Sequence, residues 1–449
     1  MRFKLSKYLI QTDQTERSGT SVLLSTRTAK AFILKKALSE KIQREDWSSL
    51  TPDEFDFFKE LEIIVPEQED ELATMLARSH EAIANVKNLY HVIQPTSVCQ
   101  LGCGYCGQTH QKGHLNAEHS DKLLLRLRGK LEKKQFNQVS ISWFGSEPLT
   151  GYPQIQYLAP KLIALAEEYQ CQYASNMVTN GLNLSEKIYF DLAKNLGVTS
   201  IEVTLDGTAE YHDNRRYTKR GKPTFNQILK NIVSIVNNPD YDREQCPISI
   251  RCNVDKHNEE SVIPLINLLA EYRLQTKISH FYAAPVHSWG NDAHLQSLEK
   301  QAFANKEIEW FRHLLELGFT LPALLPQLTP IVCLSVVPNN EVIDAFGNVF
   351  DCTETPYVDR YKGTNYIQGN LSDNTIDGER PLLSFYDQVA KEAYDCHTCV
   401  MLPVCGGGCP KSWVEGIPAC PTNKFNVKEK LLLYVATNGA REKIPAYVN

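Results

Sequence analysis

The stretch Cys99-Gln-Leu-Gly-Cys103-Gly-Tyr105-Cys106 directs the interpretation of this chain. It follows a β-type run, YHVIQP at residues 90–95, and places three thiols at C-x3-C-x2-C spacing. Three thiolates at this spacing can wrap one face of an iron–sulfur cubane, whereas a four-iron cluster takes four ligands. One iron would therefore stay open to a ligand from outside the protein. A structural zinc site would need four protein ligands, and no nearby fourth is evident.

Length and composition set the class of protein. The 449 residues suggest roughly two to four domains at about 150 residues each. The chain is 42% hydrophobic and 22% charged and lacks an apolar run near the ~18 residues that span a bilayer, so we expect no membrane association. The opening MRFKLSKYLI shows no signal peptide, which predicts a cytoplasmic protein. A formal charge of −6 without a polybasic block speaks against a nucleic-acid partner and favours a peptide or small molecule.

Cysteine usage is the most informative part of the composition. Thirteen cysteines in a chain without an export signal indicate metal or redox chemistry, because disulfides are rare in a reducing cytosol. Three form the motif above, and three scattered ones, Cys171, Cys246 and Cys252, are expected to be small buried hydrophobes. The other seven gather near the C-terminus: Cys333, Cys352, Cys396, Cys399, Cys405, Cys409 and Cys420.

Residues 1–88 form the first of three regions. Strand-like runs at residues 3–12 and 21–28, separated by the polar segment Asp13–Thr20, predict a hairpin. Helical stretches follow at 29–42, 51–64 and 71–88, the second opening on a capping signal. A small structural cap is one interpretation. The order of elements also resembles the winged-helix leader-recognition domain of peptide-modifying enzymes, in which the ligand adds a strand to an exposed sheet edge.

Residues 89–320 form the second region, in which β-type and helical segments alternate. Six βα units predict an α/β fold with a parallel sheet. Right-handed crossovers would curl this sheet into a full or partial barrel, whose active site lies at the carboxyl ends of the strands. The cysteine motif and the motifs described next all fall at such ends.

This region resembles the radical S-adenosylmethionine (radical SAM) superfamily, including the aromatic Tyr105 before the last cysteine. The resemblance implies a partial (β/α)6 barrel and a cluster on Cys99, Cys103 and Cys106, whose open iron chelates SAM. Transfer of an electron to SAM then gives methionine and a 5′-deoxyadenosyl radical. Gly145-Ser146-Glu147-Pro148 is similar to the G-G-E-P motif of the family, with serine replacing the second glycine.

Two further motifs carry the resemblance along the barrel. Thr204 stands where the family usually has serine, and His212-Asp213-x-x-Arg216 matches the peptide-modifying branch. For Arg216 the alternative is a surface ion pair, and for His212 and Asp213 we expect only a hydrogen bond at a helix start. Arg251 and Asn253 are additional candidates to face the pocket. The resemblance implies these cofactor-binding residues: Tyr105, Gly145, Ser146, Glu147, Thr204 and Arg216.

The third region, residues 321–449, is similar to the SPASM domain. Its pattern is Cys333-x13-Gly347-x4-Cys352, then Cys396-x2-Cys399-x5-Cys405-x3-Cys409, then Cys420. The resemblance implies two auxiliary [4Fe–4S] clusters, one held by Cys396, Cys399, Cys405 and Cys420 and the other by Cys333, Cys352 and Cys409. The eighth ligand is missing, which leaves an open iron, a side chain such as Gln327, or a substrate group. A zinc ribbon over 396–409 is the alternative.

Together these features predict a radical SAM/SPASM oxidoreductase with three [4Fe–4S] clusters. We expect it to install a carbon–carbon or thioether crosslink in a ribosomal precursor peptide that carries a leader, with an electron donor such as flavodoxin or ferredoxin. Sulfatase maturases have an aspartate after the second SPASM cysteine, whereas this chain has Thr353. The alternatives are a sulfatase-maturase-like enzyme, a small-molecule radical SAM dehydrogenase, and a non-catalytic cluster protein for electron transfer or sensing.

Overall fold

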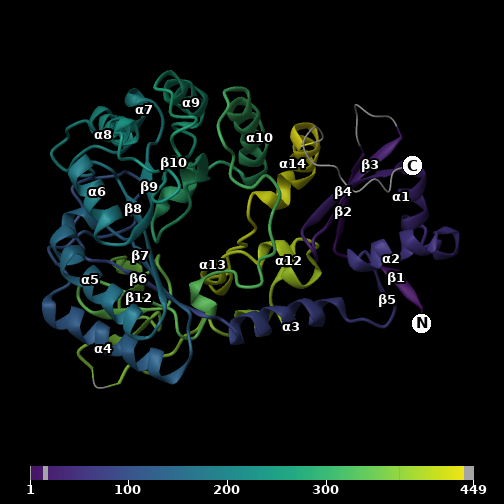
Figure 1. The fold of residues 1–449 in the computed structure, drawn as a ribbon, viewed down its shortest axis with the longest axis horizontal. Coiled ribbons are helices and arrows are strands. Elements are labelled where there is room, and N and C mark those ends of the chain that lie inside the picture. The colour runs from purple at the N-terminus through teal and green to yellow at the C-terminus, as the bar shows by residue number, and fades with distance from the viewer. Residues whose placement is uncertain (1, 14–18, 374, 439–449) are drawn as a thin grey trace.

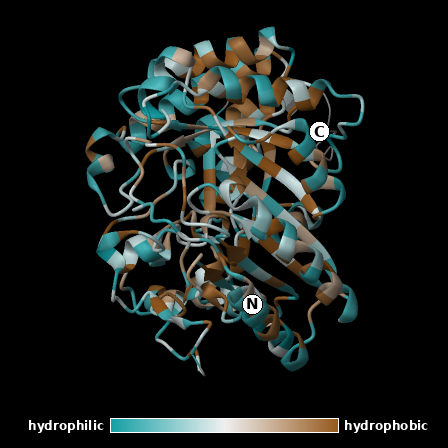
Figure 2. Ribbon diagram, turned by 90° about the vertical axis from the view of Figure 1, so that its left-hand side faces the viewer, coloured by the Kyte–Doolittle hydropathy of each residue, from teal (hydrophilic) through white to brown (hydrophobic). Residues whose placement is uncertain are grey.

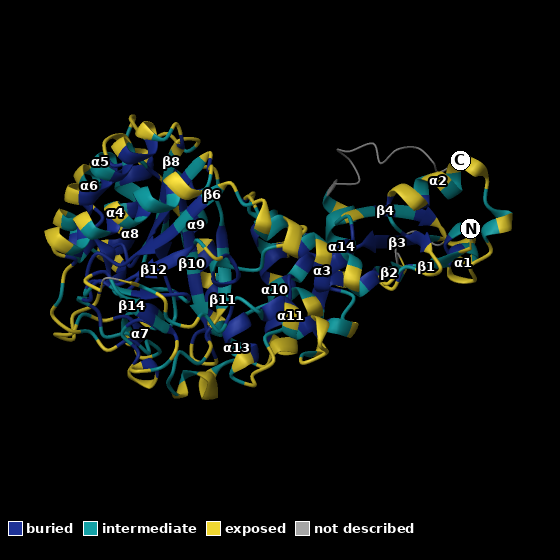
Figure 3. Ribbon diagram, turned by 90° about the horizontal axis from the view of Figure 1, so that it is seen from below, coloured by how far each residue is buried: buried dark blue, intermediate teal, exposed yellow. Residues whose placement is uncertain are grey.

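The computed structural model describes residues 2–13, 19–373 and 375–438. Figure 1 shows a large lobe built around a curved sheet and a smaller N-terminal unit, with helix α3 (Glu71–Ala84) running between them. Figure 3 shows the strands of the large lobe buried and the outer faces of its helices exposed. The C-terminal residues fill the space between the two parts, because α14 (Asn423–Asn438) packs on both α10 (Lys300–Glu316) and β2 (Leu9–Asp13).

The large lobe confirms the predicted α/β barrel. Its strands are hydrogen-bonded in the order β11-β10-β9-β8-β7-β6, and every neighbouring pair is parallel. The bounds are β6 (Asn88–Ile93), β7 (Gln138–Trp143), β8 (Gln172–Thr179), β9 (Val198–Thr204), β10 (Ile248–Val254) and β11 (Phe281–Pro285). All six carboxyl ends therefore lie at the same edge of the sheet.

Amphipathic helices cover the outside of this sheet. In α8 (Phe225–Asn237) the buried side chains include Ile228, Ile232 and Ile235, which recur at the spacing of one helix face. They join one apolar core with the strands, visible as the hydrophobic centre in Figure 2. The other helices of this lobe are α4 (Ala117–Lys133), α5 (Tyr152–Glu168), α6 (Glu186–Lys194), α7 (Ala209–Arg215), α9 (Val262–Glu271) and α10.

The sheet continues beyond the six expected strands. β12 (Glu341–Ile343) pairs parallel to β6, and β13 (Asn348–Phe350) and β14 (Ile367–Asn370) extend it in antiparallel fashion. The third region of the sequence is thus built into the barrel sheet rather than attached beside it. Cys352 follows β13 by two residues and directly precedes Thr353, which lines a cavity at the carboxyl ends of the barrel strands. The described part of the region also contains three short helices, α11 (Phe385–Ala390), α12 (Leu402–Cys405) and α13 (Pro410–Val414), and the longer α14.

A buried carboxylate fastens β12 to the barrel. Glu341 is 2% exposed and lies 2.6 Å from Arg126, 2.7 Å from Lys130 and 3.4 Å from His91. Burial works against its charge, but hydrogen bonds from Arg126 and His91 hold the pKa of Glu341 well below its ordinary value. A buried charge with partners on two neighbouring elements fixes the register of the added strand.

The N-terminal unit contains the predicted hairpin, formed by β2 and β3 (Thr20–Ser25); most of its turn lies outside the described residues. The helix expected over 29–42 was wrong in its first half, because residues 30–35 form β4, in which Phe32 and Leu34 point inward to the core. α1 (Lys36–Gln43) begins only after it. The capping box of Thr51 and Glu54 opens α2 (Pro52–Glu60), as predicted.

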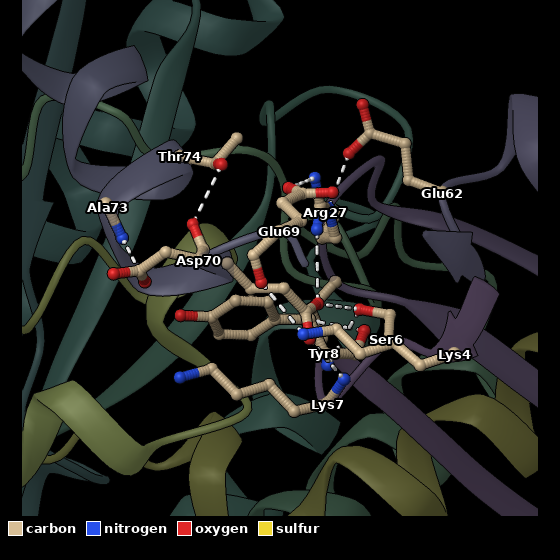
Figure 4. Close-up of polar contacts among 12 residues, drawn as sticks. Lys4, Ser6, Lys7, Tyr8, Arg27, Glu62, Glu69, Asp70, Ala73 and Thr74 are labelled. Atoms are coloured by element: carbon tan, nitrogen blue, oxygen red, sulfur yellow. Dashed lines mark hydrogen bonds and ion pairs between the residues drawn. The ribbon is translucent and has the colours of Figure 1, made fainter. Parts of the chain in front are cut away.

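An arginine network ties this unit to α3, as Figure 4 shows. Arg27, which is 3% exposed, pairs with Glu62 at 2.6 Å, Glu69 at 2.7 Å and Glu71 at 3.1 Å. Glu71 also accepts hydrogen bonds from the Ser6 hydroxyl at 2.5 Å and from a backbone amide nearby. The short strands β1 (Phe3–Leu5) and β5 (Ile64–Pro66) pair beside it. These charges hold two turns of the small sheet against the first turn of α3.

The N-terminal unit also rests on the C-terminal cysteine loop. The Thr26 hydroxyl donates to the Val400 carbonyl at 2.7 Å, and Lys7 Nζ donates to the His397 carbonyl at 3.2 Å. Tyr8 is fully buried in a hydrophobic cluster that includes Cys396. The sheet of the first region therefore covers one side of the loop that carries Cys399.

No helix among the described residues has the length and apolar character required to cross a membrane.

The environment of His91 predicts a pH dependence of stability. Burial and the charge of Lys130 lower the pKa of His91 to about 4, whereas the unfolded chain titrates near its ordinary value of 6.5. The unfolded state therefore takes up a proton that the folded state resists, and stability falls as the pH drops through this window. Between pH 6.5 and 5 the loss is about 2 kcal/mol. We expect His91→Gln to reduce the difference between the thermal midpoints at pH 7 and pH 5.

The control for this experiment is His80→Gln, at a histidine that is half exposed. The His80→Gln protein should keep the full difference between the thermal midpoints at pH 7 and pH 5. A His91→Gln protein that loses as much stability on acidification as the unaltered chain would contradict the prediction.

Candidate active site

One cavity of about 350 Å³ lies at the carboxyl ends of the barrel strands. The three thiols of the first cysteine motif line it together with residues from the ends of β7, β8, β9, β10 and β11. Of the predicted cofactor-binding residues, five line this cavity: Tyr105, Gly145, Ser146, Thr204 and Arg216. The fold thus brings together motifs that lie more than a hundred residues apart in sequence.

The cysteine loop is held from outside by the segment after α7. The Gly102 amide donates to the Tyr217 carbonyl at 2.9 Å, the Gly104 amide donates to the Arg215 carbonyl at 3.2 Å, and Leu101 forms a β-bridge with Thr218. This ladder fixes the backbone of a loop that has no regular structure of its own. The three thiols consequently face one space.

Burial gives the thiols of this loop a distinct chemistry. It raises the pKa of Cys99 to about 12, with the nearby charge of Glu147 adding to the effect. It raises the pKa of Cys103 to about 11, against the opposing influence of Arg216. The thiols are therefore neutral unless a metal stabilises the thiolates, and this donor set fits an iron–sulfur cluster.

Arg216 forms the charged centre of the site. It is 6% exposed, so it is not the surface ion pair considered from the sequence. Its guanidinium donates to the Tyr105 hydroxyl at 2.5 Å and lies 3.8 Å from the Asp206 carboxylate. The same tyrosine hydroxyl donates to Asp206 at 2.5 Å and accepts from the Asn253 amide at 3.1 Å. Asp206 was not predicted as a site residue, although it lies two residues after Thr204.

Glu147 is not among the residues that line the cavity, but it is hydrogen-bonded to Thr179 and Asn180, which do line it. It is 1% exposed and accepts hydrogen bonds from the Thr179 hydroxyl at 2.7 Å, the Asn180 amide at 2.7 Å and the Leu149 amide at 2.9 Å. Burial raises its pKa, while the hydrogen bond from Thr179 opposes the rise. Its carboxylate joins the end of β7 to the end of β8 and so holds two residues of the cavity wall in place.

The Gly145–Ser146 turn presents backbone to the cavity. Gly145 has φ +90°, and a Cβ there would lie 2.4 Å from Gln94 Nε2, so no other residue fits without displacement. Ser146 has φ +49°, an uncommon value for a residue with a side chain. Its amide donates to Gln108 Oε1 at 3.0 Å, and its hydroxyl has no hydrogen-bond partner. The exchange of glycine for serine therefore keeps the turn but strains it.

His212 and Asp213, for which the sequence predicted only a hydrogen bond at a helix start, form structural hydrogen bonds. The Asp206 amide donates to His212 Nδ1 at 3.1 Å, and Asp213 Oδ1 accepts from the Thr224 and Phe225 amides at 2.7 and 2.9 Å where α8 begins. Neither lines the cavity. Arg251 and Asn253, the additional candidates, do line it, as do residues that sequence reasoning missed: Gln108, His110, Asn180, His287, Trp289 and Glu354.

Glu354 and His287 join the C-terminal region to the barrel at this cavity. His287 Nε2 lies 2.9 Å from Glu354 Oε1, and Trp289 Nε1 donates to the Glu354 carbonyl at 2.8 Å. Thr353 lines the same space. The segment after Cys352 therefore forms one wall of the cavity, a position that only the pairing of β12 with β6 creates.

A second, smaller cavity is lined by four cysteines: Cys396, Cys399, Cys405 and Cys420. This is the set that the SPASM resemblance assigns to one auxiliary cluster. Burial and the neighbouring thiols Cys405, Cys399 and Cys420 raise the pKa of Cys396 to about 12. Lys424 Nζ donates to Cys420 Sγ at 3.4 Å and places a cation beside the thiols. A space enclosed by four thiols and one cation suits an anionic cluster.

The remaining three C-terminal cysteines also group together. Burial raises the pKa of Cys333 and of Cys352, and Cys409 contributes to both shifts.

Gln327 is exposed and donates to the Leu325 carbonyl at 3.3 Å. Within the part of the chain that is described, no three or more His, Cys, Asp or Glu side chains are arranged to hold a single metal ion. The scattered Cys171, Cys246 and Cys252 are buried, as expected.

Comparisons with known proteins agree with this geometry. Residues 93–238 match the model of the Radical SAM superfamily.

The chain carries a radical SAM domain.

A match to this model implies SAM and one [4Fe–4S] cluster. The chain is 24% identical over 357 residues to a cysteine-type anaerobic sulfatase-maturating enzyme of Clostridium novyi (strain NT), covering 74% of this chain and 91% of the relative. A serine-type enzyme of the same description from Bacteroides thetaiotaomicron is 30% identical over 157 residues, 32% of this chain and 36% of that relative. The solved structure of native anSMEcpe with bound AdoMet superposes with a TM-score of 0.55 at 16% identity, covering 78% of this chain and 97% of that one.

The radical SAM domain allows a test of Glu147 as a positioning residue. Glu147→Ala leaves three buried donors without an acceptor, each costing about 1–3 kcal/mol. We expect a loss of at least about 2 kcal/mol in urea denaturation. SAM binding, measured by equilibrium dialysis, should weaken because Asn180 at the cavity wall is released.

Glu271→Ala, at an exposed carboxylate on α9, is the matched control and should stay within about 0.5 kcal/mol of the unaltered chain. Equal stability of the two variants would show that Glu147 does not hold the strand ends.

Proposed function

We propose that this protein is a SPASM-type radical SAM maturase that modifies a peptide substrate. The observation that carries the proposal is the gathering of Cys99, Cys103 and Cys106 with the strand-end residues around one cavity, beside two further groups of cysteines. When bound, the cluster and SAM would supply a 5′-deoxyadenosyl radical that abstracts hydrogen from an unactivated C–H bond.

The residues of the chain would bind and orient the cofactor. In the proposal the three thiolates hold the cluster, the backbone at Gly145 and Ser146 receives the amino group of SAM, and Thr204 and Arg216 contact the rest of the molecule. Support comes from the cavity that these residues share and from the burial of Arg216. The ion pair with Asp206 and the hydrogen bond to Tyr105 offset the desolvation cost of burying its charge. The surrounding core excludes water, which protects a radical from quenching.

We further propose that the C-terminal region holds two auxiliary [4Fe–4S] clusters, giving three in all. The cavity formed by Cys396, Cys399, Cys405 and Cys420 supports the first. The grouping of Cys333, Cys352 and Cys409 supports the second, which would have one iron without a cysteine ligand. Because Cys352 lies next to the cavity wall, that iron would be near the substrate and could accept its second electron or a substrate thiolate.

The preferred reaction is a carbon–carbon or thioether crosslink in a ribosomal precursor peptide. It is supported by Thr353, which stands at the cavity where sulfatase maturases are expected to have an aspartate. The likeness to two sulfatase-maturating enzymes favours the second candidate, oxidation of a Cys or Ser residue in a sulfatase. Both reactions act on a polypeptide. We propose a cytoplasmic location and a one-electron donor protein, with neither nucleic acid nor membrane as partner.

The N-terminal unit, residues 1–88, is proposed to bind the leader of the precursor. Its sheet has the order β2-β3-β4, so β2 and β4 are edges that pair with no further described strand. An extended peptide can add to such an edge through main-chain hydrogen bonds. The contacts of Thr26 and Lys7 with the loop around Cys399 give this unit a fixed place beside the catalytic lobe. The barrel and SPASM-like region would span residues 89–320 and 321–449.

Replacing Cys99, Cys103 and Cys106 together by Ala tests the central assignment. We expect complete loss of 5′-deoxyadenosine formation from SAM in the reduced protein, because no ligand for the first cluster remains. Iron counting should show about four of twelve iron atoms lost, since each cluster contains four. Replacing Cys171, Cys246 and Cys252 by Ala is the control and should leave the iron content unchanged. Undiminished 5′-deoxyadenosine would refute the proposal.

Hydrogen exchange tests the role of the N-terminal unit. A bound leader should slow the exchange of backbone amides in β2 or β4, because edge amides gain hydrogen-bond partners. Amides of the central strand β3 are already paired and should change little. The measurement compares the protein with and without precursor by mass spectrometry. Protection confined to the barrel would argue that residues 1–88 are only a structural cap.

A further inference from the structure

A short basic turn lies on the outer side of the cysteine loop. Residues 215–222, RRYTKRGK, contain five basic side chains and no acidic one, in a chain whose formal charge is −6. Lys219, Arg220 and Lys222 are exposed, and Tyr217 is 39% exposed. No ion pair of these three cations with a described carboxylate is present. The run is too short to count as a polybasic block in the sequence.

The backbone of the turn presents these side chains outward. The Thr218 amide donates to the Lys222 carbonyl at 2.9 Å, and the Gly221 amide donates to the Thr218 carbonyl at 2.7 Å, with Gly221 at φ +73°. The Thr218 hydroxyl accepts from the Lys222 amide at 2.9 Å. A closed turn of this kind holds the three cations close together, which a flexible loop would not.

The same turn is attached directly to the loop that carries the first three cysteines. The Lys219 amide donates to the Gln100 carbonyl at 2.9 Å, and the Tyr217 carbonyl accepts from the Gly102 amide at 2.9 Å. A Cβ on Gly102 would lie 3.4 Å from the Tyr217 ring, so ring and loop are in close approach. The contacts fall between Cys99 and Cys103. The exposed turn is therefore separated from the thiols only by the cysteine loop itself.

The segment has two faces with different tasks. Arg215 and Arg216 are buried, and Arg216 lines the cavity proposed for SAM. Lys219, Arg220 and Lys222 are exposed to solvent, and Lys219 lies within electrostatic reach of Cys106 and His110. An electron for the cluster cannot enter conveniently through a cavity filled by SAM and substrate, whereas the outer face remains accessible. Clustered exposed cations attract an acidic partner and speed its encounter.

We propose that Tyr217, Lys219, Arg220 and Lys222 form the docking surface for a small acidic one-electron carrier protein. This inference rests on the proposed function. One electron passes from the reduced carrier to the cluster on Cys99, Cys103 and Cys106. The carrier is thereby oxidised by one electron and the cluster is reduced by one electron. No bond is made or broken in this step. The cations hold the carrier over the cysteine loop, where the path to the cluster is shortest.

The test is the full-length variant Lys219→Glu/Arg220→Glu/Lys222→Glu, loaded with its clusters. Stopped-flow reduction of the first cluster by reduced flavodoxin at low ionic strength should slow by at least about tenfold and lose most of its dependence on salt. Reduction by dithionite, a small reagent that needs no docking surface, should keep its rate. 5′-Deoxyadenosine formation with dithionite should stay unchanged.

The matched control is Lys36→Glu/Lys133→Glu/Lys391→Glu, which changes the net charge equally at three dispersed, exposed lysines. It should slow the flavodoxin reaction far less. An equal slowing in both variants, an unchanged flavodoxin rate, or a matching loss with dithionite would overturn the proposal. So would weaker binding of precursor peptide or nucleic acid with unaltered reduction by flavodoxin. A protein with no reducible cluster on Cys99, Cys103 and Cys106 would overturn the proposed function as well.

Discussion

The buried guanidinium of Arg216 is the interaction on which the site depends. It lies where the cysteine loop, the end of β9 and the end of β10 meet, and it contacts the Tyr105 hydroxyl at 2.5 Å and Asp206 at 3.8 Å. A buried cation without partners would cost several kcal/mol, so the carboxylate and the phenol must stay in place as long as the arginine does. Asn253 adds a hydrogen bond to the same hydroxyl. The loop that presents the thiols is thus coupled to the strands by charge rather than by regular structure.

A second buried charge, Glu341, organises the other half of the site. It joins β12 to α4 and β6 through Arg126, Lys130 and His91, and so brings the C-terminal region into the barrel sheet. The consequence reaches the cavity, because the segment after β13 carries Thr353 and Glu354 to its wall. The barrel alone would leave this side open. The closed and water-poor space that the proposed radical chemistry needs would therefore depend on the ion pairs of Glu341.

The N-terminal unit is linked to the rest through electrostatics as well. Arg27 and Glu71 hold its turns on α3, while Thr26 and Lys7 reach the carbonyls around Cys399. A recognition unit held in this way would bring its ligand to a constant position relative to the catalytic lobe. The basic turn at 217–222 lies on the cysteine loop of the barrel, a different element. The peptide leader would then bind at the N-terminal unit, SAM in the cavity, and the electron carrier at the basic turn.

The sequence by itself determined the features that are local. The C-x3-C-x2-C spacing and the alternation of strands and helices are visible in it, since thiol spacing and hydrophobic periodicity act over a few residues. The division of the C-terminal cysteines into two sets came from the resemblance to the SPASM domain. Tertiary structure alone decided that residues 30–35 form a strand, because pairing with β3 overrode their helical pattern. It also decided that Glu147 holds Thr179 and Asn180 at the cavity wall, that Asp206 is the partner of Arg216, and that β12 joins β6. Each of these depends on contacts between segments far apart in the chain, and no short-range pattern encodes which distant partner a buried charge or an open strand edge will find.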